Sequence, residues 1–195
     1  MSGDYSRKRF NPEKHYQGVL RQQGRVDLDA DWNEYVDLQD RRWRAETIDV
    51  VGRCGVPAET PEGFKIDVSG GELTVGQGRM YVDGYVAENH GTAPTLDGTI
   101  EEQYGTAALL VKDQPFGGPV TVPPQVRSLV YLDVWRREVT YLQAPDLIEP
   151  AVNVDTTTRN QTAWQVRILS GIPADVNCET PLEDIPGWPA GNRLS

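Results

Sequence analysis

Three aspartates near the N-terminus have a spacing that could serve metal chemistry. Asp27, Asp29 and Asp31 stand at every second position, as the first ligands of an EF-hand calcium loop do. Such a loop starting at Asp27 also needs glycine at its sixth position, for a sharp turn, and glutamate at its twelfth, as a bidentate ligand. Trp32 and Leu38 stand at these positions instead. The sequence therefore excludes an EF-hand, and we predict no metal site here.

The same acids fit the beginning of a helix. Neither glycine nor proline occurs from Asp29 to Val51, and Gly52 follows directly. This predicts one long helix that stops at Gly52 and begins with Asp27 or Asp29 as its N-cap, because a carboxylate can accept hydrogen bonds from the unpaired N–H groups of the first turn. Its apolar residues predict a broad face packed on a sheet. They are Trp32, Tyr35, Val36, Trp43, Ile48, Val50 and Val51.

No catalytic constellation is visible in the sequence. The only histidines are His15 and His90, and no GxSxG, HExxH, Walker A or paired CxxC motif occurs. We expect His90 to be an exposed residue of a turn. Cys54 and Cys178 lack metal-ligand spacing and are expected to be small, reduced core residues, although a disulfide between them stays open. We predict that the protein is not an enzyme and binds no cofactor.

Charge narrows the class of partner. The 195 residues carry a formal net charge of −10, which repels phosphate backbones and anionic lipid. The basic cluster Arg7 to Arg9 has no apolar run after it, so it does not begin a signal peptide, and no run approaches the ~18 apolar residues of a spanning helix. We therefore expect neither a nucleic-acid partner nor membrane insertion.

Beyond Pro57 the hydrophobic pattern alternates, which is typical of strands. Asp83–Gly84 predicts a two-residue hairpin turn, since both of its positions favour positive φ. The segment "SLVYLDVWRREVTYL" predicts a second hairpin that turns near Arg136–Arg137. Strands are expected at 64–68, 72–75, 79–82, 85–88 and 163–169.

These elements predict an α+β fold that is mainly β. An extended arm and one long helix would pack with antiparallel hairpins in a sandwich-like or barrel-like arrangement. The expected organisation is an arm and helix at 1–56, a β-rich domain at 57–170 and an extended Pro/Gly-rich tail at 171–195.

Several segments together resemble an uncharacterised family encoded beside phage-tail-like contractile injection systems. The similarity spans most of residues 1–169 and is most specific in its first segment. A more distant similarity is to phage proteins in which a "GR…L…WNE" segment opens a helix and a "G…YVDG" hairpin follows. The matching stretches are "MSGDYSRKRFNPEKHYQGVLRQQGRVDLDADWNEYVDLQ", "GRMYVDGYVAE", "SLVYLDVWRREVTYL" and "TTTRNQTAWQVRIL".

The resemblance implies a structural component of a tail-like particle, near the baseplate or as an attachment module for fibres or the spike. Such proteins are usually multimeric, so we expect a homo-oligomer whose other partners are baseplate, spike or fibre proteins of the particle. Relatives often continue further, sometimes into a β-helical region. The implied location is the bacterial cytoplasm during assembly and the outside of the cell in a released particle. The extended arm, residues 1–18, would lie on a neighbouring subunit. Candidate assembly contacts are Tyr5, Arg7, Lys8, Arg9, Phe10, Trp32 and Trp43.

The alternative is a carbohydrate-binding or carbohydrate-active module. It would use exposed tryptophans, which can stack on sugar rings, whereas tryptophans in a folded protein are more often part of the core or of an interface. The tryptophans are Trp32, Trp43, Trp135, Trp164 and Trp188.

The first prediction concerns calcium. Titration of the protein with calcium should leave the midpoint of its thermal unfolding unchanged, because the Asp27 stretch lacks the glycine and glutamate of a calcium loop. A clear stabilisation by millimolar calcium would show that these aspartates bind metal.

Overall fold

The computed structural model describes residues 3–69, 71–92, 99, 103–105, 107–118, 120–177 and 179–189. The fold is α+β and mainly β, as predicted, with one long helix and many antiparallel strands. The chain divides into two compact units, each built from separate segments rather than from consecutive stretches. The first comprises Met1–Cys54, Asp83–Tyr85 and Arg137–Gln161, and the second comprises Gly55–Val82, Val86–Arg136 and Thr162–Ser195.

The long helix of the first unit, α1 (Asp29–Val51), has the predicted bounds. It ends at Gly52, whose φ of 93° suits glycine and whose N–H donates to the Ile48 carbonyl at 3.0 Å. The predicted cap is wrong, because the N-cap is Leu28 in extended conformation and no side chain caps it. Asp29 is already inside the first turn, where its negative charge still meets the positive end of the helix dipole.

Most of the predicted apolar face of α1 is exposed instead of buried, and only Val36 and Ile48 of its seven residues are half-buried. Trp32, Trp43 and Val50 are 61%, 67% and 81% exposed. Spaced by eleven and seven residues, they lie about three and two turns apart at 3.6 residues per turn and so share one side. Only Ala30 and Leu38, which lie on other sides of the helix, are buried among its described residues.

The tip of a hairpin belongs to the same unit and packs against α1. Strands β4 (Gly78–Val82) and β5 (Tyr85–Asn89) are joined by Asp83 and Gly84, whose φ values of 47° and 81° confirm the predicted turn. Arg44 donates from Nε to the Asp83 carbonyl at 2.9 Å, pairs with the Asp83 carboxylate and lies over the Tyr85 ring. Arg53 pairs with the same carboxylate at 2.5 Å.

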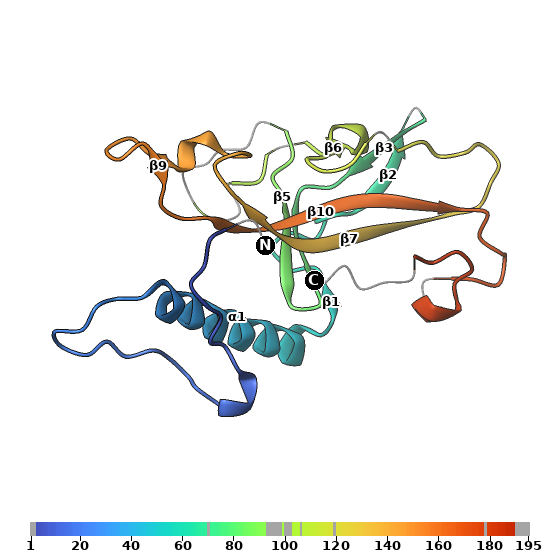
Figure 1. Ribbon diagram of the computed structural model, residues 1–195. Coiled ribbons are helices and arrows are strands. Elements are labelled where there is room, and N and C mark those ends of the chain that lie inside the picture. Colours follow the sequence, from blue (N-terminus) through green and yellow to red (C-terminus); the bar gives the residue numbers. More distant parts are fainter. Residues whose placement is uncertain are drawn as a thin grey trace. The chain divides into compact units, whose positions relative to one another are not determined.

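Within the described residues, the strands form four small sheets (Figure 1). One contains β1 (Cys54–Gly55), β4 and β5, and a second contains β2 (Ile66–Ser69), β3 (Glu72–Val75) and β6 (Leu109–Leu110) in antiparallel order. The third pairs β7 (Ser128–Val139) with β10 (Arg159–Ser170), and the fourth pairs β8 (Ile148–Glu149) with β9 (Val154–Asp155). Short 3₁₀ turns are η1 (Pro12–Lys14), η2 (Val111–Asp113), η3 (Pro145–Leu147) and η4 (Leu182–Asp184).

The second predicted hairpin is wrong, because β7 runs unbroken through Arg136 and Arg137. Two consecutive arginines interrupt an apolar pattern without providing turn geometry, for which Gly, Asn or Asp would be needed. Charge is accommodated within this pair of strands, where Arg167 of β10 pairs with Asp133 of β7 at 3.0 Å.

The core of the second unit forms around an aromatic pair. Phe64 meets Trp164 edge to face, with ring centroids 5.0 Å apart, and the Trp164 Nε1 donates to the Glu88 carbonyl at 2.7 Å. The other buried members of this cluster are Leu73, Val75, Ala87, Val111 and Val166.

Two buried amide side chains satisfy backbone groups inside this unit. Gln114 accepts from the Val166 N–H at 2.7 Å and donates to the Val166 carbonyl at 3.3 Å, as a neighbouring strand would. Asn89 donates to the carbonyls of Val75 and Gly76 at 3.1 and 3.0 Å. Both contacts remove the cost of burying unpaired backbone groups.

The C-terminal segment packs, which the expectation of an extended tail did not include. Ile172, Val176 and Ile185 form a buried cluster, with Trp188 against it. Arg127 donates to the carbonyls of Pro173 and Val176, both at 2.6 Å. Of the cysteines, Cys54 is exposed and not a core residue, and Cys178 lies outside the described residues.

Gly84→Val should destabilise the fold more than Gly71→Val. Both glycines have φ above 80°, so either valine costs about 1–2 kcal/mol of backbone strain. A Cβ at Gly84 would also lie 2.8 Å from the Arg44 carbonyl, whereas one at Gly71 would meet nothing within 4 Å. The extra overpacking cost is about 1–3 kcal/mol. Urea unfolding of both variants measures the difference, and equal losses would contradict the close packing of the turn on α1.

Candidate functional site

The arm and the beginning of α1 form the candidate site, and its contacts start at Asp29. The Asp29 carboxylate accepts from the Ser6 N–H at 2.8 Å and from the Ser6 hydroxyl at 2.6 Å. These hydrogen bonds, the hydroxyl one first, lower the pKa of Asp29 below its usual value because they stabilise the charged form. Asp29 therefore holds the arm, and not the helix end as predicted.

Unlike Asp29, which is held by Ser6, the other two aspartates have basic partners. Asp31 pairs with Arg9 of the arm. Asp27 pairs with Arg21 at 3.3 Å, in a contact whose two side chains are mostly exposed. The alternate spacing thus serves three separate contacts, and no group of three or more possible metal-ligating side chains is found among the described residues.

Tyr5 fixes the beginning of the arm within the same unit. Its hydroxyl donates to the Glu138 carboxylate and lies 2.6 Å from the Thr158 hydroxyl. Burial, and then the hydrogen bond to Glu138, raise the pKa of Tyr5, because both disfavour the phenolate. Tyr5 and Arg9 are therefore occupied within their own chain, while Arg7 and Lys8 between them are exposed.

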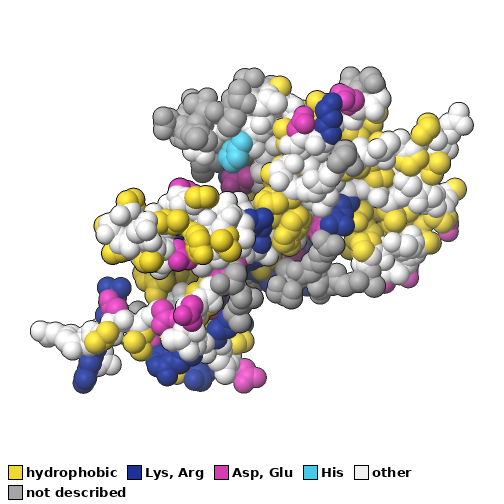
Figure 2. Space-filling view, turned by 45° about the horizontal axis from the view of Figure 1, so that its top comes forward, with side chains coloured by type: hydrophobic (Ala, Val, Ile, Leu, Met, Phe, Trp, Pro, Cys, Tyr) yellow, Lys and Arg dark blue, Asp and Glu magenta, His cyan; other side chains and the backbone are white. Residues whose placement is uncertain are grey.

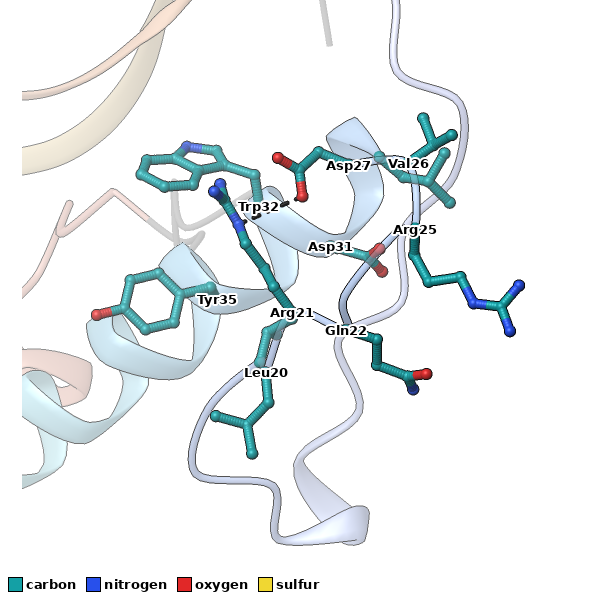
Figure 3. A pocket seen from close by; sticks show the side chains of 11 residues that line it. Leu20, Arg21, Gln22, Arg25, Val26, Asp27, Asp31, Trp32 and Tyr35 are labelled. Carbon is teal, nitrogen blue, oxygen red and sulfur yellow. Dashed lines mark ion pairs between the residues drawn. The ribbon is translucent and has the colours of Figure 1, made fainter.

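Next to the arm, the hook, defined as residues 19–28, turns back at Gln23 and Gly24 and leads into α1. A groove of about 810 Å³ lies between the hook and the first turns of the helix. Figure 3 shows Arg21 reaching from the hook toward Asp27, with Trp32 and Tyr35 on the helix beside it. The two rings are 6.2 Å apart.

The apolar lining of this groove is open to solvent. Leu20 and Val26 of the hook are 91% and 84% exposed, and Leu28 and Tyr35 are about 40% exposed. Sequence reasoning named Trp32 but missed the hook residues, because they belong to no helical or strand period. The available signal was four aliphatic side chains, Val19, Leu20, Val26 and Leu28, within a stretch that otherwise consists of Arg, Gln, Gly and Asp.

A smaller groove of about 490 Å³ lies between the arm and the middle of α1. Phe10, His15 and Tyr16 line its arm side, and Arg41 and Arg42 line its helix side. The predicted contact residue Trp43 does not line either groove but stands exposed on α1.

His90 has a structural environment in the second unit. Its ring stacks on Tyr104 at 5.3 Å, and its Nδ1 lies 3.3 Å from the Gln103 carbonyl. Tyr104 donates to Glu88 at 2.9 Å, and burial is the first cause that raises its pKa. These contacts occupy the ring within a partly buried site, so the expectation of an exposed histidine is wrong.

A family model covers the arm, the hook, α1 and nearly all of both units. It matches residues 1–185 and is described as "Family of unknown function (DUF6519)". The chain belongs to the DUF6519 family. No curated protein and no solved structure matches this DUF6519 chain. In the described part of the chain, no helix combines the length and apolarity that a membrane crossing requires.

The contact between the arm and Asp29 should depend on pH. Because the pKa of Asp29 is lowered on folding, its contact stabilises the arm above pH ~4 and is lost as the pH falls through the lowered pKa. Hydrogen exchange at the Ser6 amide, corrected for intrinsic exchange, should show protection at neutral pH that disappears in acid.

Asp29→Asn should weaken this protection at neutral pH. The substitution replaces the negatively charged carboxylate, which accepts hydrogen bonds from the Ser6 N–H and hydroxyl, by a neutral amide. Asp49→Asn, at the other end of α1, is the matched control and should leave it unchanged. Unchanged protection in Asp29→Asn would contradict the assigned role of Asp29.

Proposed function

We propose that this DUF6519 protein is a structural component of a phage-tail-like contractile injection particle. It acts at or near the baseplate or as an attachment module for fibres or the spike. The particle is proposed from the resemblance of the arm, the "YVDG" hairpin and the two later segments. The role in assembly is supported by the exposed side of α1.

That exposed side carries the proposal. Trp32, Trp43 and Val50 lie along one side of a single helix, and each is more than half exposed. Large apolar side chains aligned in this way are typical of a surface that another protein covers. The chain thereby offers a helix face to neighbouring subunits.

The arm adds a second, charged surface. Arg7 and Lys8 are exposed, while Ser6 and Arg9 on either side are held by Asp29 and Asp31. This alternation presents a fixed pair of positive charges outward, which suits an acidic surface on a neighbour. The arm is thus both anchored to its own chain and available to another.

A sugar-directed role has one supporting observation, the neighbouring rings of Trp32 and Tyr35 at the open groove. The other tryptophans give it no support except Trp43. Trp164 is buried, Trp135 packs on Phe116 and Trp188 packs on Tyr131. A glycan-array signal that is lost in Trp32→Ala would favour this second function.

Deletion of residues 2–12 should leave the second unit folded and abolish incorporation into particles. The buried clusters of the second unit consist of that unit's own residues, whereas the arm's outward charges would be lost. Particles purified from cells that express the truncated protein, with circular dichroism of the isolated protein, measure both effects.

The double variant Arg7→Glu/Lys8→Glu is the matched control, because it changes the outward charges of the arm without removing the arm's contacts with its own chain. It preserves Tyr5, Ser6 and Arg9 and so separates the outward surface from the arm's own contacts. We expect reduced incorporation with an unchanged thermal midpoint. Full incorporation of both variants would remove the arm from the assembly mechanism.

A further inference from the structure

The hook exposes two of its apolar side chains almost completely. Leu20 and Val26 stand on its two limbs, 91% and 84% exposed. Between them the chain reverses at Gly24, where φ is 70°, and the Arg25 N–H donates to the Gln22 carbonyl at 3.3 Å. The hook therefore has a defined turn and offers its aliphatic side chains outward.

Its charges identify the partner that fits. The groove is lined by two basic residues, Arg21 and Arg25, and by two acidic ones, Asp27 and Asp31. Figure 2 shows basic and acidic side chains interleaved over the arm, the hook and α1 at the lower left. Arg21 already pairs with Asp27, and Asp31 pairs with Arg9 of the arm, so the groove is close to neutral and offers a strongly acidic or strongly basic partner little opposite charge to gain.

A second copy matches this surface in both respects. In a two-fold symmetric contact, a residue of one copy that touches a second residue of the other copy has the same contact repeated with the copies exchanged. A patch that carries both signs of charge in equal number can therefore pair with itself. We infer that the hooks of two copies of this chain pack against each other, with Leu20 of each copy covering the groove of the other at Trp32 and Tyr35.

The area indicates how tight this contact is. The exposed fractions of Leu20, Val26, Leu28, Trp32 and Tyr35 correspond to about 500 Å² of side chain per copy, or roughly 1,000 Å² in the pair. This is the lower end for specific interfaces, so the dimer dissociates readily when diluted. Nearly all copies would be dimeric where they are held close together at high local concentration.

Analytical ultracentrifugation of the purified full chain, from about 10 µM to 1 mM, tests the contact. The wild type should show a reversible monomer–dimer equilibrium. Leu20→Asp should weaken it at least tenfold, because a carboxylate would have to enter the apolar groove. Leu142→Asp is the matched control, since Leu142 is also an exposed leucine of the first unit, 73% exposed, but does not line the groove.

A charge exchange tests that the partner is the same surface. Arg25→Asp makes the groove acidic and Asp27→Arg makes it basic, so each variant alone should dimerise at least tenfold more weakly than the wild type. An equimolar mixture should recover dimers, because the acidic groove of one copy then meets the basic groove of the other. Asp27→Arg also removes the ion pair with Arg21, but both side chains of that pair are mostly exposed, so circular dichroism should be unchanged in both variants.

A wild type that remains monomeric at 1 mM overturns the inference. So does a Leu20→Asp variant that dimerises like Leu142→Asp, or a mixture no better than its components. The inference deepens the proposed assembly role and rests on it for its setting in a particle. Self-association is measured on the pure chain and incorporation on particles, so each can fail while the other stands.

Discussion

The contact between Arg44 and the Asp83–Gly84 turn is the constraint around which the first unit is organised. It combines a backbone hydrogen bond, a carboxylate pair shared with Arg53, and a cation over the Tyr85 ring. Removing one partner of such a partly buried set leaves the others unsatisfied. Since the turn occupies the Arg44 and Ile48 side of α1, the side with Trp32 and Trp43 is left for solvent.

The sequence was sufficient to predict those elements whose ends are determined by neighbouring residues. The bounds of α1 followed from a glycine-free and proline-free run closed by Gly52, and the hairpin turn followed from Asp83–Gly84. The sequence could not show that β7 continues through Arg136 and Arg137, because its pairing partner β10 comes from a later part of the chain. Nor could helix periodicity reveal which side of α1 is covered, since that depends on a turn about forty residues later.

The sequence predicted several residues of the candidate site but not the contacts that they make. Tyr5, Arg9 and Trp32 are at the site, but Tyr5 and Arg9 contact their own chain. The spacing of Asp27, Asp29 and Asp31 suggested metal binding or helix capping as their role. In the structure each carboxylate instead contacts a different donor residue. A short-range pattern cannot indicate donors that arrive from residues 6, 9 and 21. The exposure of Leu20 and Val26 likewise depends on the three-dimensional course of the hook.

The buried Gln114 has a consequence for the chain's behaviour in crowded conditions. Its side-chain amide occupies both backbone groups of Val166, on the side of β10 that faces away from β7. An open strand edge is a template on which another polypeptide can add indefinitely. A side chain in that place ends the hydrogen-bonding series after one residue and adds no new edge of its own. At Val166 the outer edge of β10 is thereby closed to the backbone of another strand.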